Sequence, residues 1–356
     1  METGQRYTLE PRHNLPMLRR SFLQTAAGAA VAAPAEPIRL GIDTYSIRDL
    51  RWKAIQLLDY AAGLKLDTIQ LSGLGDYESL DPAYLAKVKD HAARLGITID
   101  AGIGCICPTS QSWSPKVGAP QEYILRGLRV AKAVGATSMR CFMGASADRR
   151  GPLPIEAHME TAVKIFRSVR SEARDLGVKI ALENHSGDLQ AREVKTIIEQ
   201  SGPDYVAVCL DSGNPIWAIE DPLLTLEVLA PYTVTTHIRD TAIWEHPRGA
   251  AAQWVAVGEG SIDYREFVAR YRQLCPKAGM QLEIITGRQP LIFPYLEPDF
   301  WKAFPKTPAA EFARFLALAK RGRPFTASVA ADQRRDLERS LDYCKKTLDV
   351  GVKWRG

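Results

Sequence analysis

Four polar residues stand at the ends of apolar segments in the second half of the sequence. They are Glu183, Asp211, His237 and Glu283, spaced 28, 26 and 46 residues apart. Three carboxylates and one imidazole form an oxygen-rich donor set, which favours octahedral Mn²⁺, Mg²⁺ or Co²⁺ over Zn²⁺. One such residue alone is more often a capping or salt-bridging group. Three carboxylates gathered at one edge, however, would repel one another without a cation. The pattern therefore predicts a divalent metal site, with Mn²⁺ as the preferred ion.

The elements that hold these residues must place their ends side by side, and the sequence supplies such elements. Eight short apolar segments alternate with segments of helical periodicity. The eight are 38–45, 68–71, 97–103, 138–143, 179–183, 205–211, 233–237 and 280–285. Strands alternating with helices predict a parallel sheet, and eight units fit a (β/α)8 barrel, which needs about 250 residues. In such a barrel the carboxyl ends of the strands form one rim, where the active site lies.

The helical segments carry boundary signals of their own. Apolar residues from Met159 to Leu176 recur at helical spacing, and Gly177 follows as a helix-ending residue. Asp263 and Glu266 resemble a capping box for the helix before the eighth strand. A long loop, about 240–262, is expected before that helix.

A doubly wound open sheet is the competing α/β architecture. It usually has a glycine-rich turn after its first strand, and residues 41–45 contain none. We therefore predict a (β/α)8 TIM barrel over residues 37–288, followed by a C-terminal helical extension over 289–356. The extension is expected to begin as an arm rich in proline and aromatic residues, across the barrel. Two helices would follow, at about 309–320 and 328–347.

The first 36 residues have the composition of an export signal. Arg19 and Arg20 precede an alanine-rich stretch, and Ala33-Pro34-Ala35 offers a cleavage site after Ala35. We expect a twin-arginine signal and a periplasmic or otherwise exported protein. A disordered alanine-rich arm is the alternative. No run of 18 apolar residues occurs, so no membrane span is predicted.

Charge and histidine content argue against a nucleic-acid partner. The formal net charge is +5, and no block of like charge forms a basic patch. An apurinic-site endonuclease, which has a barrel of this class, uses several zinc ions and many histidines. Of the six histidines here, only His185 and His237 end a strand.

The order of motifs along residues 38–286 resembles the xylose isomerase-like TIM barrel superfamily of sugar isomerases and epimerases. The motifs are Leu182-Glu183-Asn184-His185, Leu210-Asp211-Ser212-Gly213-Asn214, His237-Ile238-Arg239-Asp240, Val257-Gly258-Glu259-Gly260-Ser261-Ile262-Asp263 and Leu282-Glu283. The resemblance implies that the four rim residues are metal ligands. It also implies that Glu183 and Glu283 form an acid/base pair, one on each face of a small carbohydrate substrate.

The residue types fit proton transfer next to a carbonyl, because a divalent ion stabilises the resulting enediolate while carboxylates move the proton. Proton return gives epimerisation or isomerisation, whereas loss of a β-leaving group gives elimination. We expect a metal-dependent keto-sugar isomerase or epimerase. Two alternatives stay open: a dehydratase or lyase acting on a keto-sugar or 3-keto-glycoside, and a non-catalytic sugar-binding protein.

Five further residues are candidates for substrate contact: His185, Asn214, Arg239, Trp254 and Tyr45. His185 would bind a hydroxyl or shuttle a proton, or else orient a metal ligand. Arg239 would bind an anionic or polyhydroxyl substrate, or form a salt bridge. Trp254, expected in the long loop, would stack on a sugar or anchor that loop. The sequence leaves the oligomeric state open, a homo-oligomer included.

Overall fold

The computed structural model describes residues 37–325 and 332–356. The twin-arginine segment predicted over residues 1–36 lies outside the described residues, so export stays a prediction. The same holds for the first turn of the helix expected at 328–347.

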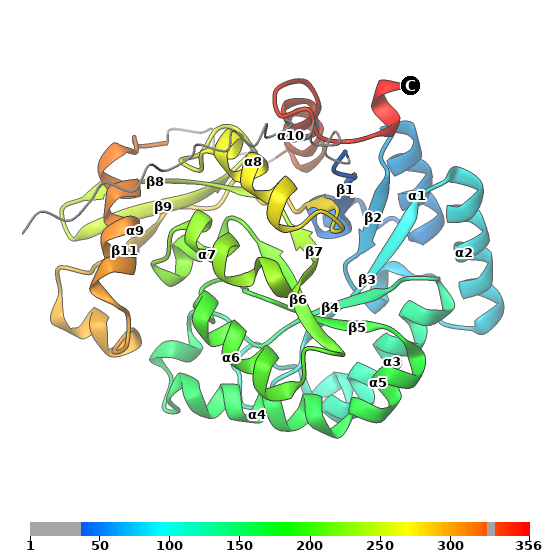
Figure 1. Ribbon diagram of the computed structural model, residues 1–356, viewed down its shortest axis with the longest axis horizontal. Helices are drawn as coiled ribbons and strands as arrows, with labels where there is room; N and C mark the ends of the chain where they lie inside the picture. The colour runs from blue at the N-terminus through cyan, green and yellow to red at the C-terminus, as the bar shows by residue number, and fades with distance from the viewer. Residues whose placement is uncertain (1–36, 326–331) are drawn as a thin grey trace, which may run out of the picture. The chain divides into compact units, whose positions relative to one another are not determined.

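Eight parallel strands form the barrel at the centre of the described chain (Figure 1). They are β1 (Leu40–Asp43), β2 (Thr68–Leu71), β3 (Thr98–Cys105), β4 (Ser138–Phe142), β5 (Lys179–Glu183), β6 (Val206–Asp211), β7 (Thr233–His237) and β10 (Met280–Leu282). Their order is β10-β1-β2-β3-β4-β5-β6-β7. Ile238, one residue beyond β7, bridges Leu282 of β10 in parallel and so joins the two strands at the ends of this order. The predicted (β/α)8 barrel is confirmed.

Burial explains why the strands could be recognised as apolar runs. Every residue of β2 and of β6 is buried, as expected for strands covered on one face by helices and on the other by the barrel interior. The first strand is shorter than the expected 38–45. The Asp43 carboxylate accepts a hydrogen bond from the Tyr45 backbone N–H and turns the chain into a 3-10 helix, η1 (Thr44–Leu50).

Helices surround the strands and fill the connections (Figure 1). They are α1 (Ala54–Gly63), α2 (Pro82–Leu95), α3 (Pro120–Ala133), α4 (Ile155–Ser168), α5 (Arg170–Leu176), α6 (Ala191–Ser201), α7 (Pro222–Leu229) and α8 (Tyr264–Leu274). Short 3-10 helices are η2 (Leu74–Asp76), η3 (Pro115–Val117), η4 (Asp148–Arg150), η5 (Asn214–Ala218), η6 (Ala230–Tyr232), η7 (Pro298–Ala303) and η8 (Lys353–Arg355).

Two helix boundary predictions can be compared with the structure. The single stripe from Met159 to Leu176 is divided between α4 and α5, because Val169 leaves the helical conformation at φ −110° and ψ 12°. Gly177 ends α5 in the left-handed conformation, as predicted. Asp263 caps α8 by accepting a hydrogen bond from the Glu266 backbone N–H at 3.1 Å.

The expectation of a loop over residues 240–262 was wrong for its first two thirds. Those residues form an antiparallel hairpin of β8 (Asp240–His246) and β9 (Gly249–Val255), and β11 (Leu291–Phe293) adds to β9. Alanine is depleted in strands, so the run Ala250-Ala251-Ala252 gave no strand signal. Its small side chains are buried in this second sheet.

The C-terminal part ends in two helices, α9 (Ala309–Arg321) and α10 (Gln333–Lys346). Helix α9 packs on β8, and α10 packs on η1 and β10. Figure 1 shows α9 with the three-stranded sheet on one side of the barrel and α10 near its first strand. Among the described residues, no helix is long and apolar enough to cross a membrane.

Candidate metal and substrate site

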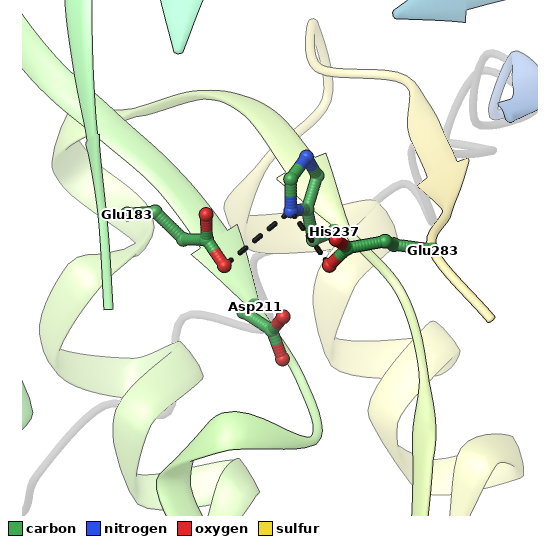
Figure 2. Close-up of side chains that lie close together, drawn as sticks. All are labelled: Glu183, Asp211, His237 and Glu283. Atoms are coloured by element: carbon green, nitrogen blue, oxygen red, sulfur yellow. Dashed lines mark ion pairs between the residues drawn. The ribbon is translucent and has the colours of Figure 1, made fainter. Parts of the chain in front are cut away.

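The four rim residues come together at the carboxyl ends of neighbouring strands. Glu183, Asp211 and His237 are the last residues of β5, β6 and β7, and Glu283 directly follows β10. Each offers one ligand atom, and these atoms lie within 4.8 Å of one another. Figure 2 shows Glu183 and Glu283 reaching toward His237 from opposite sides. The Nδ1 atom of His237 is 3.4 Å from Glu183 Oε1 and 3.0 Å from Glu283 Oε2.

Backbone hydrogen bonds fix Asp211 so that one carboxylate oxygen is left for the cluster. Its Oδ1 accepts hydrogen bonds from the Gly213 and Asn214 N–H groups, both at 2.8 Å. Asn184 joins the strand ends, because its side chain both donates to the Asp211 carbonyl and accepts from the Asp211 N–H. Oδ2 is buried, lacks a well-aligned hydrogen bond among the described residues, and lies beside the Arg239 guanidinium.

The donor set fits a divalent cation. Asp211 Oδ2, His237 Nδ1 and Glu283 Oε2 are all buried and lack a well-aligned hydrogen bond within the described chain, although Arg239 forms ion pairs with both carboxylates and His237 with Glu283. Buried polar atoms are normally paired, and three neighbouring carboxylates repel one another unless a cation lies among them. Carboxylate oxygens with one imidazole suit an octahedral ion such as Mn²⁺ or Mg²⁺.

Two residues from the first two strands of the barrel contact the Nε2 side of the His237 ring, away from the cluster. Its Nε2 lies 3.4 Å from Asp43 Oδ2 and contacts the Gln70 amide. Gln70 Nε2 also donates to Asp43 at 2.9 Å. A carboxylate at the second ring nitrogen fixes the orientation of a ligating histidine, so β1 and β2 aim Nδ1 at the cluster.

Two buried arginines provide positive charge beside the carboxylates. Arg140, from β4, donates from Nε to Glu183 Oε2 at 2.5 Å. Arg239 Nη2 lies 2.7 Å from Asp211 Oδ2 and contacts Glu283. The sequence prediction that Arg239 forms a salt bridge with an acid therefore agrees with the geometry, but the partners are the rim carboxylates.

The surroundings shift the pKa values of two rim carboxyls in opposite directions. Burial raises the pKa of Glu183, but the positive charges of Arg140 and His237 outweigh burial and hold it well below its usual range. For Asp211, burial is stronger than the attraction of Arg239 and raises the pKa to about 6. Glu183 is thus the firmly ionised member of the set.

A pocket of about 270 Å³ adjoins the cluster. Its lining includes Tyr45, Arg140, His185, Arg239, Trp254 and Glu283. The volume lies just below the roughly 300–1,000 Å³ of pockets for drug-sized ligands. The pocket therefore has the size for a small molecule with one carboxylate of the cluster, Glu283, exposed to it.

Four of the five predicted substrate-contact residues line this pocket. His185 stacks on Phe142 with ring centroids 3.9 Å apart, and its Nδ1 lies 2.6 Å from the Gly144 carbonyl oxygen. Trp254 projects from β9, and Tyr45 from the first turn of η1. The fifth residue, Asn214, is buried and donates to Glu183 Oε1 at 3.2 Å. Its contact with substrate stays a prediction.

Sequence reasoning missed several residues of the site. Arg140 carries a visible signal, since it is an arginine inside the apolar run 138–143. Arg288 and Phe142 also line the pocket. Asp43 is the last residue of β1, but it lies inside the expected segment 38–45, so the search for polar residues at segment ends did not select it. Arg288 has no comparable local signal, because it lies beyond the last barrel strand.

A barrel with an acidic and histidine cluster at the carboxyl rim defines a class of (β/α)8 proteins with a candidate metal site at that rim. Within this class, the family described as xylose isomerase-like TIM barrel matches residues 58–287. The chain belongs to this family, and the predicted resemblance is confirmed.

Individual relatives show what the chain is similar to. It is 25% identical over 237 residues to a 3-oxo-isoapionate decarboxylase of Pectobacterium atrosepticum, covering 63% of this chain and 78% of that protein. The structure of the 3-keto-D-glucoside 4-epimerase YcjR from E. coli superposes with a TM-score of 0.54 at 14% identity, covering 79% and 98%. A xylose isomerase-like barrel protein from Mycobacterium smegmatis, solved with magnesium, superposes with a TM-score of 0.55 at 14% identity, covering 80% and 97%.

Proposed function

We propose that this protein is a metal-dependent isomerase or epimerase of a keto-sugar. The observation that carries the proposal is the place of Glu283, which belongs to the buried ligand cluster and also lines the pocket. A carbonyl compound in this pocket would therefore lie against both a base and the proposed metal ligands. The names of similar proteins, a keto-glucoside epimerase and a 3-oxo acid decarboxylase, support carbonyl chemistry.

The protein groups would move a proton at the carbon next to the carbonyl. A divalent ion held by the four rim residues would polarise the carbonyl and stabilise the negative charge that develops on the substrate oxygens. Glu283 would remove the proton and return it to the adjacent carbon in an isomerisation, whereas in an epimerisation the ionised Glu183 would remove the proton from one face and Glu283 would return one to the other. Figure 2 supports this division, since the two glutamates approach the centre from opposite sides. Trp254 and Phe142 would limit access of water.

His185 and Tyr45 are proposed to bind substrate hydroxyl groups. The His185 Nδ1 atom is engaged by the Gly144 carbonyl oxygen, so Nδ1 carries the ring proton and Nε2 is left as the acceptor for a hydroxyl. Burial, followed by the nearby Arg140 and Arg239, lowers the pKa of His185 to about 4 despite the attraction of Glu183. A neutral imidazole suits hydrogen bonding to a hydroxyl group.

A lyase is the second candidate function. Loss of CO₂ from a 3-oxo acid leaves an electron pair on the carbon next to the carbonyl. In an elimination, proton removal forms the same electron pair, which becomes a double bond as the β-leaving group departs. The same ion would stabilise the negative charge in both cases. The curated decarboxylase relative and the arginines that line the pocket favour this candidate. A sugar-binding protein without catalysis is the third.

An isotope-exchange experiment separates these functions. Mg²⁺- or Mn²⁺-loaded protein would be incubated in D₂O with ketoses, keto-sugar acids and 3-keto-glycosides, and samples quenched with chelator would be followed by proton NMR. Deuterium entering the carbon next to the carbonyl, with a new sugar isomer, is expected. Release of CO₂, water or an aglycone instead would establish the lyase. Metal-loaded protein that binds panel members without converting them would contradict both enzyme proposals.

The variant Glu283→Gln tests the proposed base. Exchange is expected to fall by about 10²–10⁴-fold, with unchanged melting temperature and with metal content measured by elemental analysis. Glu199→Gln is the matched control, since Glu199 is an exposed carboxylate on α6 whose ion pair is with Lys195. Wild-type exchange by metal-loaded Glu283→Gln would refute the role of Glu283.

A further inference from the structure

Three arginines surround the substrate pocket. Arg140, Arg239 and Arg288 all line it, together with one acidic side chain, Glu283. Arg140 is buried and pairs with Glu183. Arg239 is also buried and pairs with Asp211 and Glu283. Arg288 is exposed, and no carboxylate of the described chain lies within ion-pair distance of it. Within the described part of the chain, the Arg288 charge therefore has no carboxylate to balance it.

The formal charges of the side chains at the cluster and pocket, summed with a divalent ion, give one unbalanced positive charge. The carboxylates Glu183, Asp211, Glu283 and Asp43 contribute four negative charges, and the two buried arginines reduce this sum to two. A divalent ion held by the four rim residues would bring the sum to zero. Asp188, behind His185, does not line the pocket, and its oxygens accept hydrogen bonds from the backbone N–H groups of Gly144, His185 and Leu189. Arg288 then makes the loaded pocket singly positive.

Arg288 is directed at the pocket by contacts on both its backbone and its side chain. Its carbonyl accepts a hydrogen bond from Gln253 Nε2 at 2.6 Å. Its guanidinium carbon lies over the Trp254 ring, 5.7 Å from the centroid, and that of Arg239 lies 5.1 Å from the same centroid. A guanidinium spread on an aromatic ring keeps its N–H groups available for a planar anion.

We propose that the substrate is a singly charged keto-sugar acid of monosaccharide size, whose carboxylate binds Arg288 at the pocket mouth. This inference rests on the proposed function, since it places the carbonyl end of the substrate at the rim cluster. A carboxylate matches the planar fork of arginine and carries the single charge that the pocket lacks. The pocket volume of about 270 Å³ suits one small sugar acid.

Matched ligands test the carboxylate directly by binding. D-fructose, D-fructuronate and D-fructose 6-phosphate differ only at carbon 6, and D-galactose, D-galacturonate and D-galactose 6-phosphate form a second set. Titration calorimetry with Mg²⁺-loaded protein is expected to give at least a tenfold lower Kd for the carboxylate member of a set than for its neutral member. No preference for a carboxylate in either set would overturn the proposal. Tighter binding of the phosphate esters would overturn it in favour of a phosphorylated sugar.

Variants at Arg288 assign the preference to this residue. Arg288→Gln is expected to weaken carboxylate binding about 10- to 100-fold, the range for a charge-assisted hydrogen bond, and to leave neutral sugars unaffected. Arg129→Gln removes the same charge from an exposed position on α3 and should retain the preference. A preference that survives Arg288→Gln would refute the inference.

Isotope exchange keeps the two proposals distinguishable. Deuterium exchange with neutral ketoses, without a preference for carboxylates in binding, would refute the sugar-acid inference but support the proposed function. A carboxylate preference that is lost in Arg288→Gln, without deuterium exchange on any ligand, would support the sugar-acid inference and exclude the proposed isomerase activity.

Discussion

Buried carboxyl groups in this protein are stabilised in two ways. Glu183 has a guanidinium partner and stays ionised, because Arg140 more than offsets the cost of burial. Glu220 has no such partner among the described residues. Its two oxygens accept hydrogen bonds from the Ala191 N–H, at 3.1 and 2.9 Å, at the start of α6, and Oε2 accepts a long one from the Thr225 hydroxyl at 3.5 Å. These two neutral donors do not replace the hydration of a carboxylate.

Glu220 should therefore make stability depend on pH. Burial, assisted by Glu193 and Glu311, raises its pKa to about 8 against the opposing effects of the Ala191 N–H and Arg192. Between about pH 4.5 and 8 the folded state holds a proton that the unfolded state has lost, so stability falls as pH rises through this window. Glu220→Gln, which accepts the same hydrogen bond without ionising, is expected to stabilise the fold by about 2–4 kcal/mol at pH 8 and by little at pH 4.

Urea unfolding at several pH values measures this effect. The control is Glu199→Gln, an exposed carboxylate on α6, which should change stability by less than about 0.5 kcal/mol at either pH. A Glu220→Gln gain that does not grow with pH would contradict the raised pKa.

At the scale of elements, the hairpin of β8 and β9 forms one wall of the pocket. Asp240, the first residue of β8, is buried and accepts hydrogen bonds from the Thr241, Gly258 and Gly260 N–H groups at 2.8, 3.0 and 3.0 Å. A Cβ atom at Gly260 would lie 2.0 Å from Asp240 Oδ1, so glycine is required there. The Asp240 carboxylate thus fixes the connection between β9 and α8. Strand β9 carries Trp254.

Asp240→Ala is expected to destabilise the protein by about 3–5 kcal/mol, because several buried N–H groups lose their shared side-chain acceptor. Ligand binding should weaken as well, since Trp254 would no longer be held at the pocket. Thermal unfolding and calorimetric titration measure the two effects. Glu245→Ala, at an exposed position of the same strand, should be nearly neutral in both. Equal stability of the two variants would show that the carboxylate does not anchor this connection.

For the molecule as a whole, the C-terminal segment is attached to the first strand of the barrel. Asp67, just before β2, accepts hydrogen bonds from the N–H groups of Leu40, Val352 and Lys353 and so ties the C-terminus to the first strand. The Gly351 N–H also donates to the Ile38 carbonyl. Four aliphatic side chains of this segment are buried: Leu337, Leu341, Leu348 and Val350.

Deletion of residues 332–356 is expected to abolish cooperative folding. Four buried aliphatic side chains contribute roughly 6–12 kcal/mol, which is comparable to the whole stability of a typical domain, about 5–15 kcal/mol. Circular dichroism during heating is the measurement, with removal of the exposed Arg355 and Gly356 alone as the control. A sharp transition within a few degrees of the full chain would contradict the structural role of α10.

Local sequence determined the barrel and its rim. The eight apolar segments are recognisable because the strands of a parallel barrel are buried on both faces, and Glu183, Asp211 and His237 stand where those runs stop. Helix ends such as Gly177 were predictable for the same reason, since the conformation of a cap depends on neighbouring residues.

The tertiary structure decided the partners of these residues and the wall of the pocket. Arg140 meets Glu183, 43 residues away, only because β4 and β5 pair in the observed register. Asp43 reaches His237 across the barrel interior, so no local pattern connects them. The alanines of β9 become a strand through pairing with β8 and β11, and this pairing carries Trp254 to the pocket. Arg288 joins that wall because its carbonyl accepts from Gln253 of β9. Sequence thus determined what depends on neighbouring residues, and the structure decided what depends on contacts between distant strands.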